Sequence, residues 1–251
     1  MTSSFLAGHY PINSERVNQY ILICYDYDSN AILAEALPSR SGSYINKGVQ
    51  KILDTLTTAG HVPKLHIMDN EACDILKNTL LQQKISYQLV PPHTHYHNTA
   101  ERAIKAFKDH SIAGLCATDP KYPSQEWDRL LPQATMTLNL LLTSSRTPKL
   151  SAYAAIFGIH DFNRCPLGPP STKVIFHEKT NNRPYWYPHG TDGWYIGPSI
   201  EKYRYVQCFM PATSSARNVD KITFVPAAIP FRKKEWYGKR NEGNFVHVAD
   251  T

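Results

Sequence analysis

Lys64-Leu-His-Ile-Met-Asp69 is a short apolar run that ends on a carboxylate. It has the length and composition of a strand, and Pro63 marks its beginning. Between Glu71 and Gln83, apolar residues then recur at helical spacing. The sequence therefore predicts a strand that delivers Asp69 at its carboxyl end and a helix that follows almost at once.

A second strand and a second helix come next. Tyr87-Gln-Leu-Val90 is strand-like and is stopped by Pro91-Pro92. After a His-rich loop, Asn98 or Thr99 can cap a helix whose first turn carries Glu101. An acid at the end of a strand and an acid in the first turn of a later helix can converge on one divalent cation. This arrangement suits phosphodiester chemistry.

The residues before this stretch predict three strands and a helix. Gln19–Tyr27 is rich in β-branched and aromatic residues, Ala31–Leu37 forms the returning strand, and Phe5–Ile12 is a weaker first strand. Ser43–Ala59 has the apolar face of a helix. Three antiparallel strands, then helix, strand, helix, strand and helix, is the order of an α/β protein with an RNase H-like fold.

The composition of the sequence changes in its last third. A helix over Ser124–Thr143 is followed by several prolines and then by short aromatic strands. Five cations lie close together in the last twenty residues. We therefore expect an RNase H-like core over residues 1–160, a small β-rich module over 165–230 and a basic, flexible tail over 231–251.

Composition limits the class of protein. The 251 residues carry a net charge of +6 and have a pI near 9.0, which allows nucleic-acid binding without establishing it. The five cysteines are odd in number and form no CxxC pair. This argues against a disulfide framework and a cysteine zinc site, and it fits a reducing compartment. No signal peptide and no apolar run of membrane-spanning length is visible.

Several long phrases resemble copia-type retrotransposon integrases, which have a retroviral-type catalytic core. They are Asp69-Asn-Glu71, Tyr87-Gln-Leu-Val-Pro-Pro-His93, Asn98-Thr-Ala-Glu-Arg-Ala-Ile-Lys105, Trp127-Asp-Arg-Leu-Leu-Pro-Gln-Ala-Thr135 and Pro188-His-Gly-Thr-Asp-Gly-Trp-Tyr-Ile-Gly-Pro198. The resemblance implies an RNase H-like integrase core. It also implies that Asp69 and Glu101 are the second and third acids of a catalytic triad that binds Mg²⁺ or Mn²⁺.

The first acid of that triad is missing. The phrase Phe5-Leu-Ala-Gly-His-Tyr-Pro11 resembles the family's first strand, but family members carry Asp at the position of Phe5. Asp26 is a doubtful substitute, because using it would leave the meander one strand short. We therefore expect an incomplete triad, with weaker metal binding and impaired strand transfer. Whether the chain is an enzyme stays open.

The helix that carries Glu101 also carries the expected DNA contacts. Lys105 and Lys108 follow Glu101 by four and seven residues and share its helix face, and Arg102 is next to it. In the family this face approaches the DNA end, so the resemblance implies phosphate contacts. A solvated basic face with no ligand is an open alternative.

The loop before that helix carries three alternating histidines. His93, His95 and His97 would face one side of an extended segment, which is a metal-like spacing. His95 matches the family phrase, which favours a role in the DNA-binding loop of an integrase over a separate zinc site.

Together these observations predict an integrase core of a mobile element, without the family's N-terminal zinc-binding domain. Its partners would be element ends, target DNA and further copies of the chain in a homodimer or multimer, with no membrane. The expected location is the nucleus, otherwise the cytoplasm, and the chain is not expected to be secreted. A non-catalytic nucleic-acid-binding or assembly module is the main alternative. An RNase H-type nuclease is disfavoured, and a decayed coding sequence stays open.

Overall fold

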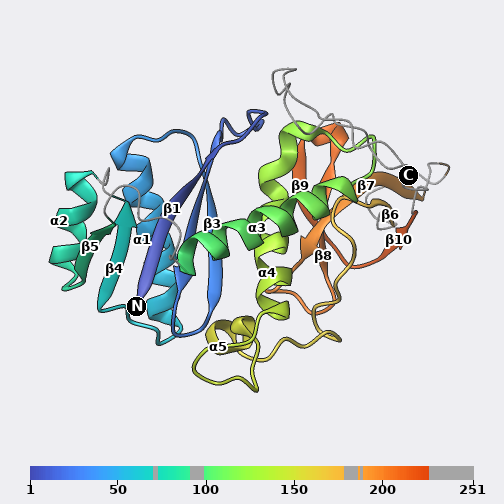
Figure 1. The fold of residues 1–251 in the computed structure, drawn as a ribbon. Coiled ribbons are helices and arrows are strands. Elements are labelled where there is room, and N and C mark those ends of the chain that lie inside the picture. The colour runs from blue at the N-terminus through green and yellow to red at the C-terminus, as the bar shows by residue number, and fades with distance from the viewer. Residues whose placement is uncertain (70–72, 91–98, 178–185, 187–188, 226–251) are drawn as a thin grey trace, which may run out of the picture.

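The computed structural model describes residues 1–69, 73–90, 99–177, 186 and 189–225 (Figure 1). The first sheet contains five strands: β1 (Thr2–His9), β2 (Tyr20–Asp26), β3 (Ala31–Leu37), β4 (Leu65–Asp69) and β5 (Ser86–Val90). Its helices are α1 (Gly42–Thr58), α2 (Asp74–Gln82), α3 (Thr99–Cys116), the 3₁₀ helix η2 (Ser124–Leu130), α4 (Leu131–Leu141) and α5 (Ala152–Phe157). Among the described residues, no helix has the length and apolar character needed to cross a membrane.

The first sheet has the strand order β3-β2-β1-β4-β5. β1, β2 and β3 pair antiparallel, whereas β4 pairs parallel with β1 and β5 parallel with β4. An antiparallel meander extended by two parallel strands through helical crossovers is the RNase H-like topology. The predicted fold class is therefore confirmed.

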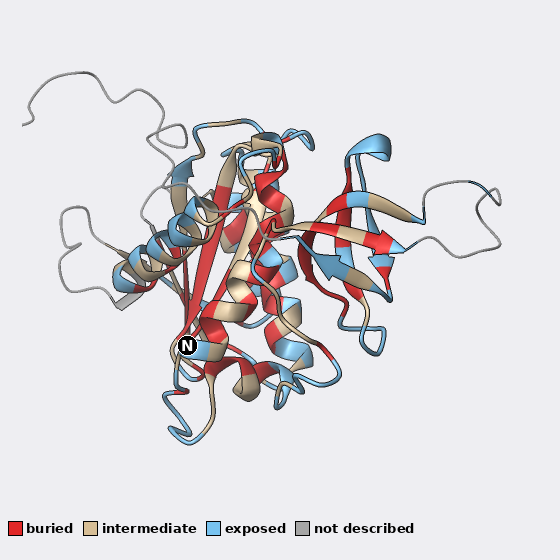
Figure 2. Cartoon of the chain, turned by 90° about the vertical axis from the view of Figure 1, so that its right-hand side faces the viewer, coloured by how far each residue is buried: buried red, intermediate tan, exposed pale blue. Residues whose placement is uncertain are grey.

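Helices cover both faces of this sheet. Leu22 and Met68 point to the face where α1 and α2 pack, with Leu53 and Leu80 in the same cluster. Residues at the alternate positions pack on α3, η2 and α4, as Ile23 does in a cluster that contains Phe107 and Trp127. Figure 2 shows the buried residues concentrated along these strands and on the helix surfaces that face them. Each face of the sheet thus has its own apolar core.

The second sheet is antiparallel throughout and has the order β10-β6-β7-β8-β9. Its strands are β6 (Lys173–His177), β7 (Gly190–Pro198), β8 (Val206–Met210), β9 (Ser215–Val219) and β10 (Ile222–Phe224). The sequence does not predict β9, because Ser215-Ala-Arg-Asn218 is polar and exposed at the sheet edge. The strands fall inside the range predicted for the β-module. The basic tail over 231–251 lies outside the described residues.

The second sheet packs against η2. Leu130 of η2 shares a small apolar cluster with Ile196 and Phe209 of the second sheet. The Arg129 guanidinium lies 5.2 Å from the centre of the Phe209 ring and donates a hydrogen bond to the Ser214 carbonyl at 3.2 Å. Apolar packing and a cation–π contact therefore join η2 to the second sheet, and α4 also contacts β7.

The first strand begins earlier than predicted. The sequence predicts Phe5–Ile12, but β1 runs from Thr2 to His9. Thr2, Ser3 and Ser4 are polar yet buried, so apolar patterning gives no sign of a strand there. The predicted helix over residues 124–143 also differs, since η2 gives way to α4 at Leu131. Pro132, which has no N–H to donate, stands in the first turn of α4 and favours a new helix start.

Candidate metal centre and nucleic-acid interface

The pairing of β1 with β4 decides which residue lies beside Asp69. Thr2 pairs with His66 and Ser4 pairs with Met68 in parallel register. The next residue on β1 is Phe5, and the next residue on β4 is Asp69. Continued by one residue, this register would set Phe5 and Asp69 at the same level on neighbouring strands, which lie about 4.8 Å apart in a sheet.

Both positions belong to the face of the sheet that α3 covers. Met68 packs on the opposite face, with α1 and α2, so position 69 falls on the α3 face. Phe5 pairs with Ile23 in the antiparallel ladder, and Ile23 packs in the same cluster as Phe107 of α3. Phe5 itself is half-buried. The register thus places an aromatic side chain where the resemblance implies a carboxylate.

Glu101 lies in the first turn of α3. Ala103, two residues later, packs in the same apolar cluster as Ile23 and Tyr25 of β2. The start of α3 therefore covers this face of the sheet.

Positions 5, 69 and 101 come from β1, β4 and α3, and the resemblance implies that they meet at one corner of the sheet. A divalent ion such as Mg²⁺ or Mn²⁺ prefers oxygen ligands, and a phenyl ring supplies none. Within the described part of the chain, no group of three or more His, Cys, Asp or Glu side chains could hold a metal ion. Phe5 in particular offers no ligand to an ion at this corner.

Asp26 lies on the other face of the sheet from Phe5. It is the last residue of β2 and pairs with Thr2, three residues before Phe5, so it belongs to the α1 and α2 face. Its Oδ2 accepts hydrogen bonds from the Ser29 amide at 3.0 Å and the Ser29 hydroxyl at 2.6 Å, and it lies 3.7 Å from His61 Nδ1. The carboxylate of Asp26 is therefore buried and already engaged in the turn between β2 and β3.

The predicted DNA-contacting side chains on α3 are exposed. Ala103 and Phe107 of this helix are buried against the sheet, whereas Arg102, Lys105 and Lys108 are exposed. Three cations thus project from the helix that carries Glu101. This exposure is what phosphate binding requires, and contact with DNA stays a prediction. His95 lies outside the described residues.

A buried polar network between β1 and β4 was not predicted from the sequence. His66 is fully buried, and its Nδ1 and Nε2 lie 2.9 Å from the Thr2 hydroxyl and 2.8 Å from the Ser4 hydroxyl. Burial lowers the pKa of His66 to about 4, so the ring is neutral near pH 7. Hydroxyls at alternate positions of the first strand, with a lone histidine inside an apolar strand, are the signal that could have revealed it.

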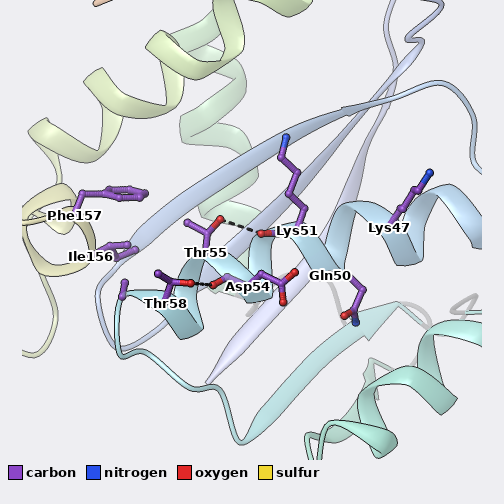
Figure 3. A pocket seen from close by; sticks show the side chains of 9 residues that line it. Lys47, Gln50, Lys51, Asp54, Thr55, Thr58, Ile156 and Phe157 are labelled. Carbon is purple, nitrogen blue, oxygen red and sulfur yellow. Dashed lines mark hydrogen bonds between the residues drawn. The ribbon is translucent and has the colours of Figure 1, made fainter. Parts of the chain in front are cut away.

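A further surface hollow lies elsewhere. It has a volume of about 730 Å³ and is formed by α1 and α5 (Figure 3). Lys47, Lys51 and Asp54 reach it from α1, and Phe157 reaches it from α5. Because α1 covers the face of the sheet opposite to α3, this hollow is separate from the corner formed by positions 5, 69 and 101.

No protein-family model matches the sequence, and no curated protein matches it. Many solved structures resemble the fold, and three of them are described here. The catalytic core domain of BIV integrase is 14% identical with a TM-score of 0.46, and the match covers 62% of this chain and 91% of that one. The HTLV-2 integrase catalytic core domain in complex with magnesium is 14% identical with a TM-score of 0.45, and the match covers 62% and 94%.

The third structure is a simian T-cell lymphotropic virus intasome in complex with PP2A regulatory subunit B56 gamma. It is 12% identical with a TM-score of 0.49, and the match covers 90% of this chain and 78% of that one. At such low identity these similarities concern the path of the backbone. The chemistry of this chain depends on its own residues.

Proposed function

We propose that this chain is the catalytic-core region of a copia-type integrase that binds DNA and whose strand transfer is impaired. The copia-type assignment rests on the phrases around Asp69 and Glu101. The impairment rests on Phe5, because metal-dependent phosphoryl transfer in this fold needs carboxylates from three elements. The proposed partners are element-end DNA, target DNA and further copies of the chain. A nuclear location stays a prediction.

One observation supports this proposal above the others. The parallel register of β1 and β4 sets Phe5 beside Asp69 on the face that α3 covers. Glu101 stands in the first turn of α3. Asp69 and Glu101, the two acids that the resemblance assigns to the triad, therefore lie at a strand end and a helix start, and Phe5 stands where the resemblance implies the third acid.

A strand-transfer assay on Phe5→Asp tests the proposal. Purified variant protein, DNA ends and Mn²⁺ or Mg²⁺ would be incubated, and joined products would be quantified on a gel. We expect the wild-type chain to join ends at background level and Phe5→Asp to raise the yield at least about tenfold, because the added carboxylate completes the ligand set. Phe5→Asn is the matched control, since the asparagine side chain has nearly the same size as aspartate but carries no charge.

A second substitution links any gained activity to the proposed corner. Asp69→Asn in the Phe5→Asp background should return the yield to background, because the neutral amide is a weaker ligand for a hard cation. Robust joining by the wild-type chain would contradict the impairment. Equal yields from Phe5→Asp and Phe5→Asn would contradict the assignment of the corner.

The second candidate is a non-catalytic nucleic-acid-binding or assembly module. Phe5 at the ligand position and the exposed cations on α3 favour it. It predicts DNA binding that is unchanged in Asp69→Asn, because phosphate contacts do not need the acid. Failure of Phe5→Asp to gain strand transfer, together with intact DNA binding, would favour this candidate over the first.

A further inference from the structure

Two adjoining hollows lie along α3, and neither is lined by the residues at positions 5, 69 and 101. One has a volume of about 270 Å³ between α3, α4 and the segment around Gly168. The other has a volume of about 250 Å³ between α3 and the carboxyl end of β1. Both are lined by Tyr10, Ile21, Ser111 and Leu115. Together they reach the size of a small-molecule site, roughly 300–1,000 Å³.

The lining of the larger-volume hollow is mostly apolar and partly aromatic. The Tyr10 ring stacks on Trp127 with centroids 4.0 Å apart and an angle of 18° between the planes. Trp127 Nε1 donates to the Ile12 carbonyl at 2.9 Å, so the polar atom of the indole is already satisfied. Leu131 and Pro170 complete the apolar wall. Such a lining favours a flat apolar ligand.

Two lining side chains carry buried polar atoms without a hydrogen-bond partner. Ser111, which lines both hollows, has an unpaired Oγ. Gln133 is 3% exposed and has an unpaired Oε1, while its Nε2 donates to the Gly168 carbonyl at 2.7 Å. That bond fixes the amide orientation, because the carbonyl can only accept. Unpaired buried acceptors cost free energy that a donor from a ligand would offset.

A glycine of α3 borders the larger-volume hollow. Gly114 lies inside α3 and lines this hollow. A Cβ at this position would meet only Pro170 Cγ, at 3.9 Å, which is an ordinary contact. Alanine would therefore fit without filling the hollow, whereas a longer side chain would occupy it.

We propose that the hollows along α3 form a binding site for a small, flat aromatic molecule that carries one hydrogen-bond donor. The ring would lie among the apolar walls and the donor would reach Ser111 Oγ, with Gln133 Oε1 as a second acceptor. Lys108, a proposed phosphate contact, lines one of the two hollows, but binding in them needs neither metal nor DNA. The inference can therefore fail without the proposed function failing.

Two probes test the site: indole, which has an N–H donor, and 1-methylindole, which lacks it. Dissociation constants would be measured by NMR titration of the full chain. We expect indole to bind the wild-type chain with a Kd at or below about 1 mM. The 1-methyl derivative should bind at least about threefold more weakly, because it cannot donate to the unpaired acceptors.

Two variants of one residue locate the binding. Gly114→Leu should weaken indole binding at least about tenfold, because the new side chain fills the hollow. The Kd of Gly114→Ala for indole should stay within about threefold of the wild-type value. Alanine, like leucine, has a higher helix propensity than glycine, but it does not fill the hollow. Circular dichroism and thermal unfolding would confirm that both variants fold.

Three results would overturn the proposal. One is the absence of indole binding to the wild-type chain up to 5 mM, about five times the expected Kd. Another is equal affinity of Gly114→Leu and Gly114→Ala, which would place the probe elsewhere. The third is equal affinity for the two probes, which would remove the role of the buried acceptors.

Discussion

The two faces of the β1–β4 pair differ in how polar groups are treated. On the α1 and α2 face, Thr2 and Ser4 both bond the ring of His66, so a buried polar group is fully satisfied. On the α3 face, one residue further along, Phe5 stands beside Asp69 without offering a ligand. The same strand pair thus keeps the hydrogen bonds that stabilise the fold, whereas Phe5 offers no oxygen ligand to a metal ion. Contacts that hold a fold and residues that do its chemistry are separable.

The largest effect expected is the pH dependence of the free energy of unfolding that His66 causes on the α1 and α2 face. The folded pKa of His66, about 4, lies below its ordinary value of 6.5. As pH falls from 6.5 to 4, the unfolded chain takes up a proton that the folded chain does not, so the free energy of unfolding falls. This group contributes its full stability above pH 6.5 and loses about 3 kcal/mol by pH 4. Chemical denaturation at several pH values measures it.

His66→Gln is the control for that titration, because the amide keeps hydrogen-bonding groups but does not ionise in this range. The loss of stability between pH 7 and pH 4 should be about 3 kcal/mol smaller in the variant than in the wild type. Equal losses would mean that His66 is not responsible for the pH dependence.

A smaller effect compares a paired hydroxyl with an unpaired one. Ser4→Ala should lower the free energy of unfolding by about 1–3 kcal/mol, because a ring nitrogen of His66 is left buried without a partner. Ser111→Ala should not lower it, since the Ser111 hydroxyl has no partner to lose and its unpaired burial is itself unfavourable. Equal costs in denaturant titrations would contradict the distinction between the two hydroxyls.

The α3 face can be tested by stability as well as by activity. Phe5→Asp should become more stable when Mn²⁺ is added, by about 1–3 kcal/mol at metal concentrations of roughly ten to a hundred times the Kd. The wild-type chain and Phe5→Asn should change far less. Thermal unfolding with and without the metal measures this, and an equal shift in all three would show that Mn²⁺ acts at another place.

The smallest effect concerns the cations of α3. Lys105→Ala and Lys108→Ala should each reduce the slope of log K against log salt for DNA binding by about one unit. Lys47→Ala removes the same charge from α1, on the opposite face of the sheet, and should leave the slope unchanged (Figure 3). Binding isotherms at several salt concentrations decide it. A similar loss in all three variants would indicate a non-specific charge effect.

Much of the fold could be predicted because its central strands are apolar. β2 and β3 match the residues expected of them, and α1 matches its apolar periodicity. The start of β1 could not be predicted, because Thr2-Ser-Ser4 is polar and its burial depends on His66, more than sixty residues away. Edge strand β9 was not predicted for a related reason, since its exposed polar residues do not alternate with apolar ones as a strand pattern requires.

The candidate site was predictable only in part. Asp69 and Glu101 were found through phrases that surround them, and the missing acid was placed at Phe5 through a third phrase. Placing Asp26 on the face opposite to Phe5 needed the register, because the sequence does not say which residues pair across a sheet. The hollows along α3 gave no signal, since cavities arise from side chains of elements far apart in the chain.

The most direct test of the central claim is a crystal structure of Phe5→Asp grown with Mn²⁺, with anomalous scattering used to locate the ion. The account predicts an anomalous peak at the corner, within roughly 2.0–2.3 Å of carboxylate oxygens from positions 5, 69 and 101. A peak bound by other residues, or carboxylates of positions 69 and 101 that lie on different faces of the sheet, would contradict it.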